Sequence, residues 1–95
     1  MAERILIIED EVKIARVLQL ELQFEGYEAA MVHSGADGLL AFHDESWDLV
    51  LLDWMLPEMS GLEVLKRIRK QNETTPIILL TAKDEISDKV TALDA

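Results

Sequence analysis

The segment "LVLLDWMLPEMSG", residues 49–61, joins an apolar run to a carboxylate, a proline and a glycine. Four consecutive apolar residues are typical of a short strand that is buried on both faces of a sheet. The run ends at Asp53, where a neutral turn residue would serve, and Pro57 and Gly61 then bend the chain and begin a helix. The segment therefore predicts a buried strand with a carboxylate at its C-terminal end.

The same apolar character returns in three other places, at residues 4–8, 27–32 and 77–80. Helical patterns lie between the strands, so the predicted order is strand then helix, four times over. Strands joined by helical crossovers run parallel, and such a sheet needs helices on both of its faces. The predicted fold class is therefore α/β, a doubly wound parallel sheet built from four β-α units.

The four helical segments are recognised by their apolar spacing and their capping residues. The first spans residues 11–25, with Gly26 as a stop and an apolar stripe of Ile14, Ala15, Leu18 and Leu22. The second is capped by Ser34 and runs to about residue 45, with Ala36, Leu39, Leu40 and His43 at helical spacing. The third runs from residue 61 or 62 to residue 70, with Leu62, Leu65 and Ile68 inward. The fourth begins at residue 84 or 85 and carries Ile86, Val90 and Leu93.

Composition narrows the classes of function. The length of 95 residues corresponds to one domain, and a content of 49% hydrophobic and 29% charged residues is ordinary for a globular protein. The formal net charge of −10 argues against direct nucleic-acid binding and favours cations or basic protein partners. The lack of cysteine excludes disulfides and thiolate sites. No apolar run is long enough for a membrane span and no signal-peptide pattern is present, so we expect a cytoplasmic location without membrane contact.

Carboxylates follow two of the predicted strands. The first strand is followed by "EDE" at residues 9–11, and the third ends at Asp53. Ligands of open parallel sheets bind outside the carboxyl ends of the strands, so Glu9, Asp10 and Asp53 converge if these two strands are neighbours. Two carboxylates about 4 Å apart repel by about 4 kcal/mol at an effective dielectric of about 20, so the cluster needs a proton or a cation. Mg²⁺, which prefers oxygen ligands, is the natural occupant.

Each of these residues also has an ordinary structural interpretation. An aspartate after a strand is commonly a turn or cap residue, and an acidic run commonly stabilises the N-terminal end of a helix. Thr81, directly after the fourth strand, can be a helix cap. Trp47 is most simply a packing residue, and Trp54 either faces the rim of the site or covers a helix. The combination at three strand ends favours phosphoryl chemistry, in which a carboxylate attacks in line beside a metal.

The motifs "RILIIEDE", "DLVLLDWMLPEMSGLEVLKRIRK" and "TPIILLTAKDE" carry a family resemblance. In this order and spacing they are similar to the receiver domains of two-component response regulators, and the resemblance covers the whole chain. It is strongest to the OmpR-like receivers that precede a winged-helix DNA-binding domain. The resemblance implies the strand order 2-1-3-4, a sensor histidine kinase as partner, and a role in transcription regulation through an output domain that contacts DNA.

The resemblance also implies a role for each site residue. Asp53 would be the phosphoacceptor, phosphorylated by the histidine kinase in a Mg²⁺-dependent reaction. Glu9 and Asp10 would bind Mg²⁺, one directly and the other through water, and the main-chain carbonyl of Met55 would be a further ligand. Thr81 would hydrogen-bond the phosphoryl group. The domain would be no enzyme in the usual sense, with only self-catalysed phosphotransfer and dephosphorylation.

The family pattern extends past Ala95 with a fifth strand, a Lys-Pro pair and a fifth helix. The resemblance therefore implies a receiver domain over residues 1–95 that is incomplete at its C-terminus and is separated from its DNA-binding output domain. The missing lysine normally pairs with the phosphoacceptor, and we do not assign its role to Lys83. Without a fifth strand, residues 77–80 would form an exposed edge strand, which invites a homodimer or a strand-swapped oligomer.

Three alternative functions stand beside this one. A truncated protein-interaction module would keep the fold without switching. An aspartyl-nucleophile phosphatase of the dehalogenase type has a second Asp two positions after the nucleophile, where this chain has Met55. A flavin binder of the same fold needs a hydroxyl-rich phosphate loop after the first strand, where this chain has acidic residues.

Overall fold

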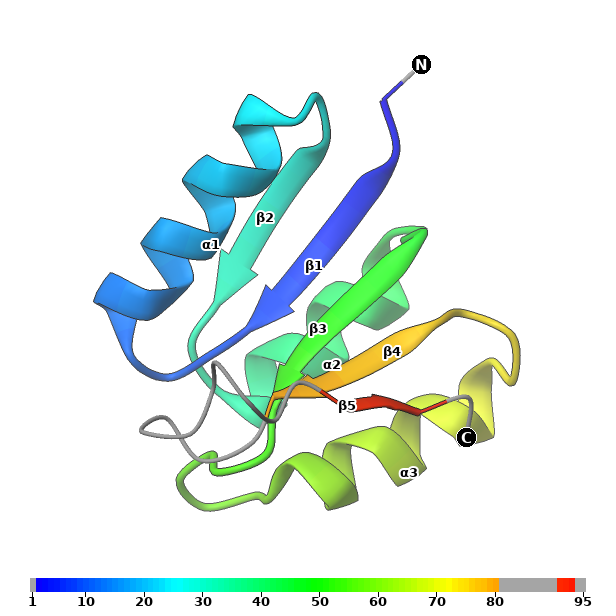
Figure 1. Ribbon diagram of the computed structural model, residues 1–95. Helices are drawn as coiled ribbons and strands as arrows, with labels where there is room; N and C mark the ends of the chain where they lie inside the picture. Colours follow the sequence, from blue (N-terminus) through cyan, green and yellow to red (C-terminus); the bar gives the residue numbers. More distant parts are fainter. Residues whose placement is uncertain (1, 81–90, 94–95) are drawn as a thin grey trace.

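The computed structural model describes residues 2–80 and 91–93 of the chain. The elements follow one another as β1 (Arg4–Ile8), α1 (Val12–Phe24), β2 (Glu28–Val32), α2 (Gly35–Asp44), β3 (Leu49–Asp53), α3 (Gly61–Gln71), β4 (Ile77–Leu80) and β5 (Thr91–Leu93). The sheet has the strand order β2-β1-β3-β4-β5, and β1 to β4 run parallel (Figure 1). The predicted α/β class and the order 2-1-3-4 are confirmed. Among the described helices, none has the length and apolar character of a membrane span.

The core is divided between the two faces of the sheet, because successive side chains of a strand point to opposite faces. One face packs against α2 and α3 through Leu6, Ile8, Val50, Leu52, Ile77 and Leu79, with Phe42, Val64, Leu65 and Ile68 from the helices. The other face packs against α1 through Ile5, Ile7 and Leu51, with Ala15, Leu18 and Leu22 from the helix. Both faces of the strands are therefore apolar, as the uninterrupted apolar runs in the sequence predict.

Helix ends follow the expected capping chemistry. The Ser34 hydroxyl accepts a hydrogen bond from the backbone N–H of Asp37 (3.1 Å) at the start of α2. Gly26 has a φ of +97°, which a glycine adopts without steric cost, and it follows the last turn of α1. In α3, Leu65 and Ile68 are buried as predicted, but Leu62 is 39% exposed, because the buried stripe runs through the neighbouring helical position.

Helix α2 packs through its glycines, which differs from the expected pattern. Among the residues at the expected spacing, Leu39 contacts the core, whereas Leu40 is 61% exposed. Gly35 and Gly38 are buried instead. A Cβ atom at Gly38 would lie 2.5 Å from Cδ1 of Ile8, so only a glycine lets the helix approach the sheet this closely. Hydrophobic periodicity cannot detect a contact made by a missing side chain.

The segment Thr91–Leu93 also differs from the expectation. It forms β5, antiparallel to β4 with Leu93 opposite Ile77, and does not continue the helix predicted from residue 84 or 85. The earlier part of that predicted helix lies outside the described residues. The expectation that β4 is an exposed edge strand is therefore wrong, whereas the strand that the family pattern places past Ala95 is a different segment from β5. The reason is that β5 forms hydrogen bonds with the edge of β4, whose backbone groups would otherwise be exposed. The prediction of a strand-swapped oligomer assumed an unpaired β4, so it loses its basis.

Substitution of Gly38 tests the close contact between α2 and the sheet. We expect Gly38→Leu to lower the free energy of unfolding by about 1–3 kcal/mol, because the new side chain overlaps Ile8 in a closed core. The matched control is Ala36→Leu, an exposed position of the same helix where the change should be within about 0.5 kcal/mol. Equal urea-unfolding midpoints for the two variants would contradict the expectation.

Candidate functional site

The carboxyl ends of β1 and β3 meet at one edge of the sheet. In the parallel register Ile8 pairs with Leu52, so Glu9 and Asp53 occupy the next level on two neighbouring strands. The backbone N–H of Glu9 donates to the carbonyl of Val32 on β2 (3.1 Å), which extends the strand pairing by one residue. The backbone pairing of three adjacent strands therefore determines the position of these two acidic residues along the sheet edge.

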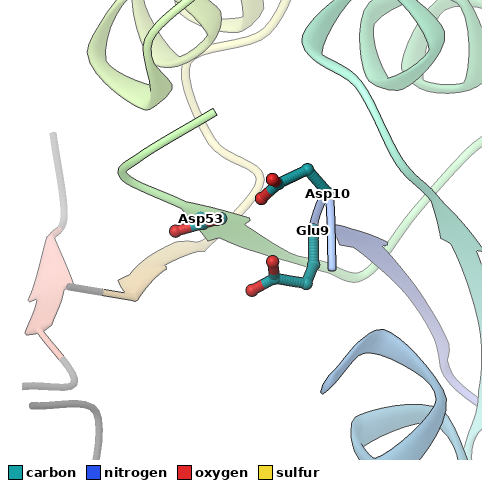
Figure 2. A group of neighbouring side chains, drawn as sticks. All are labelled: Glu9, Asp10 and Asp53. Carbon is teal, nitrogen blue, oxygen red and sulfur yellow. The ribbon is translucent and has the colours of Figure 1, made fainter. Parts of the chain in front are cut away.

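Three carboxylates converge at this edge. One oxygen from each of Glu9, Asp10 and Asp53 lies within 4.8 Å of the others, and Figure 2 shows the three side chains directed toward a common space. Glu9 and Asp53 are 0% exposed and Asp10 is half-buried. Oxygen donors at this spacing and burial suit a small, hard cation, bound directly or through water. The residues present therefore fit the Mg²⁺ that the sequence predicted.

Backbone N–H groups orient two of these carboxylates. Oε2 of Glu9 accepts a hydrogen bond from the N–H of Glu11 (2.9 Å), and Oδ1 of Asp53 accepts one from the N–H of Met55 (3.1 Å). Each bond links a residue to the second residue after it, so each strand end turns back toward its own carboxylate. Such bonds hold the carboxylate oxygen atoms in place before any ligand arrives.

The loop after β3 is held against Asp53 by a glycine. The N–H of Gly61 donates to the carbonyl of Trp54 (3.0 Å), and a Cβ at Gly61 would lie only 2.5 Å from the carbonyl oxygen of Asp53. Leu56 is buried in the core, and Glu58 takes a positive φ of 67° within the turn. The sequence predicted that Gly61 bends the chain and begins a helix, and the structure adds this close contact with the backbone of Asp53.

A pocket of about 430 Å³ opens beside the acidic cluster. It is lined by Asp10, Trp54, Met55, Leu56, Pro57, Ser60 and Leu62. The Trp54 side chain is 39% exposed, so it lies on the rim of the site, one of its two expected positions. Trp47 is buried and donates from Nε1 to the carbonyl of Ala41 (2.9 Å), in agreement with a packing role.

Some residues named in the sequence cannot be placed in the same way. Thr81 and Lys83 lie outside the described residues. Met55 lies two residues beyond Asp53, its N–H bonds that carboxylate and its side chain is 59% exposed. The role of the Met55 carbonyl as a metal ligand stays a prediction.

His33 is a neighbour of the site to which the sequence pattern assigned no functional role. Its Nδ1 atom lies 3.0 Å from the main-chain oxygen of Glu9. The available signal was its place in the sequence, since it directly follows β2, whose carboxyl end meets that of β1. A polar residue after any strand of a parallel sheet is a candidate for the same edge.

Comparisons with known proteins give matches that cover most of the chain. The family model described as "Response regulator receiver domain" matches residues 5–95. YkoG of Bacillus subtilis, described as an uncharacterized transcriptional regulatory protein, is 62% identical over 90 residues, which are 95% of this chain and 40% of YkoG. The response regulator ArlR of Staphylococcus saprophyticus is 48% identical over 91 residues, 96% of this chain and 41% of ArlR. The chain thus spans about two fifths of the length of these relatives.

Solved structures show the same fold. The response regulator TrrA of Thermotoga maritima, in complex with Mg²⁺-BeF, has a TM-score of 0.82 and 44% identity, covering 90% of this chain and 76% of TrrA. TrrA in complex with the histidine kinase ThkA has a TM-score of 0.80 and 46% identity, covering 84% of this chain and 69% of the other.

The contact of Gly61 with the Asp53 backbone can be tested by adding one methyl group. We expect Gly61→Ala to lower the free energy of unfolding by about 1–3 kcal/mol, because the Cβ meets backbone atoms that cannot rotate away. We also expect weaker Mg²⁺ binding, because the loop that orients Asp53 has to shift. Urea unfolding and a Mg²⁺ titration followed by tryptophan fluorescence measure the two effects.

Gly26→Ala is the matched control for this variant. A Cβ there meets no heavy atom within 4 Å, and the positive φ alone costs about 1–3 kcal/mol at the opposite end of the sheet. The control should therefore lose stability and keep its Mg²⁺ affinity. An equal loss of affinity in both variants would show that Gly61 acts only through global stability.

Proposed function

Because the chain belongs to the response regulator receiver domain family, we propose that Asp53 accepts a phosphoryl group from a histidine kinase in a Mg²⁺-dependent reaction. The observation that carries the proposal is the convergence of Glu9, Asp10 and Asp53 at the carboxyl ends of β1 and β3 (Figure 2). Two-component signalling is the role of this family. The assignment of each atom to the chemistry is the proposal.

Asp53 would act as the nucleophile. One of its carboxylate oxygens forms a bond to phosphorus while the bond from phosphorus to the histidine nitrogen breaks, and the imidazole leaves. Glu9 and Asp10, with Asp53 and the main-chain carbonyl of Met55, would hold Mg²⁺. When bound, this ion offsets the negative charge on the transferring phosphoryl oxygens. The Mg²⁺-BeF complex of TrrA, 44% identical to this chain, supports this choice of ion.

Thr81 would hydrogen-bond the phosphoryl group. The support is its position in the sequence, because Leu80 is the residue that pairs with Asp53 across β3 and β4, and Thr81 follows directly. Phosphorylation adds about −1.5 to −2 charges to an already acidic edge. We propose that this charge is the signal, relayed to an output domain that contacts DNA, since the relatives include transcriptional regulators. A cytoplasmic location belongs to the same proposal.

The surface of α1 is our candidate docking site for the kinase. The helix begins two residues after Asp10, and its exposed side carries Val17 (59% exposed), Leu20 (48%) and Phe24 (87%). Three apolar side chains on one exposed stripe fit a partner better than they fit water. TrrA, 46% identical to this chain, forms a complex with a histidine kinase, which supports a partner of this class.

A binding module that keeps the fold without accepting phosphate is the second candidate. The half-exposed Trp54 on the pocket rim allows the two to be separated, since a cation beside Asp53 should perturb the indole. Metal binding alone would support the module, whereas metal binding followed by covalent phosphorylation supports the receiver.

Substitution of the proposed nucleophile is the direct test. We expect phosphoramidate, a small donor with an N–P bond, to add one phosphoryl group to the wild-type chain in Mg²⁺ and none to Asp53→Asn, as read by intact mass. Asp44→Asn, at an exposed position of α2, should behave like the wild type. Phosphorylation of Asp53→Asn at the wild-type rate would overturn the assignment.

The docking proposal has its own test. We expect the double variant Leu20→Ser, Phe24→Ser to lower kcat/KM for transfer from a histidine kinase by about five- to thirtyfold, the effect of removing one or two anchoring contacts. Phosphorylation by phosphoramidate should be unchanged, since the small donor needs no docking surface. Leu40→Ser, exposed on α2, is the control. An unchanged transfer rate in the double variant would place the docking surface elsewhere.

A further inference from the structure

The main-chain carbonyl of Glu9 is bound by the ring of His33. Nδ1 of His33 lies 3.0 Å from this oxygen, and the residues are 24 positions apart in the sequence. A carbonyl oxygen only accepts hydrogen bonds, so Nδ1 carries the proton and donates it. Both the neutral Nδ1–H tautomer and the imidazolium can do so. The contact is therefore a directed hydrogen bond from the end of β2 to the end of β1.

The peptide group held by His33 joins two of the three residues whose carboxylates form the cluster. The carbonyl of Glu9 belongs to the peptide unit that joins Glu9 to Asp10, so its orientation sets the direction in which the chain leaves β1. On the other side of Glu9, its N–H donates to the carbonyl of Val32 (3.1 Å). Both backbone polar groups of Glu9 are thus bound by the carboxyl end of β2.

This arrangement resists the repulsion within the cluster. Three carboxylates within 4.8 Å of one another push apart, and the chain between Glu9 and Asp10 could relax by rotating this peptide unit. A hydrogen bond to its carbonyl opposes that rotation. A site held in the binding geometry before the ion arrives loses less free energy on binding, which is why outer residues of metal sites affect affinity.

We propose that His33 is a positioning residue for the cation site, acting on Glu9 and Asp10 through the main-chain carbonyl between them. The inference rests on the proposed function, because it assumes that the carboxylates bind Mg²⁺. It assigns no contact between His33 and the ion. A purely structural role would predict that loss of the ring lowers stability and leaves the affinity for Mg²⁺ unchanged.

The experiment compares variants that differ in the hydrogen-bond donor at this position. His33→Phe keeps a ring without a nitrogen, and His33→Asn restores a donor, because the Asn amide nitrogen stands about where Nδ1 does. His43, an exposed residue of α2 and the other histidine of the chain, supplies the control His43→Asn. Each variant is measured for its Mg²⁺ dissociation constant by tryptophan fluorescence and for its stability by urea unfolding without Mg²⁺.

We expect His33→Phe to raise the dissociation constant by about three- to tenfold, with His33→Asn and His43→Asn within about twofold of the wild type. If the wild type binds Mg²⁺ and His33→Phe binds it equally well, this inference is overturned and the proposed function stands. If the wild type binds no Mg²⁺, both this inference and the proposed function are overturned. If His33→Phe does not fold, His33→Ala provides the same comparison.

A second measurement tests the hydrogen bond itself without any metal. With only two histidines in the chain, nitrogen-15 NMR of the imidazole rings can assign the protonated nitrogen of His33. We expect a proton on Nδ1 in the metal-free protein. A neutral ring protonated only at Nε2 would exclude the donor and overturn the inference, whatever the Mg²⁺ titrations show.

Discussion

The parallel pairing of β1 with β3 is the constraint on which the rest of this structure depends. Its register places Ile8 beside Leu52, and the next residues on both strands are buried carboxylates. A slip of one residue would turn every side chain of a strand to the opposite face of the sheet and separate Glu9 from Asp53. The apolar runs of both strands are buried on both faces, so the same packing that stabilises the sheet holds the acidic cluster together.

The cluster gathers negative charge in a poorly solvated place, and the backbone around it limits the cost. N–H groups of Glu11 and Met55 donate to two of the carboxylates. Gly61 lets the following helix approach the carbonyl of Asp53 closely. These contacts come from the turns after the strands and not from the sheet. The strands therefore determine where each acidic residue lies, and the turns determine how its carboxylate is oriented. The preorganisation is what a small cation and a phosphoryl group would use.

Much of the fold was predictable because its signals are local. The apolar runs, Ser34 as a cap and Gly26 as a stop act within a few residues, and each prediction is confirmed by the structure. The predictions were wrong where a contact between residues far apart in the sequence determines the structure. Leu40 has the spacing of a core residue, but glycines of α2 make the close contact with the sheet and leave it exposed. Leu93 has helical spacing, but Thr91–Leu93 pairs with β4.

By itself, the sequence determined the order of strands and helices from β1 to β4. It also placed acidic residues directly after the first and third strands, because burial and capping leave local patterns. Only the tertiary structure decided how close the carboxylates lie, which backbone groups orient them, and that His33 bonds the peptide unit joining Glu9 to Asp10. These contacts join residues that belong to different strands and turns. Their geometry depends on the register and twist of the whole sheet, which no single segment specifies.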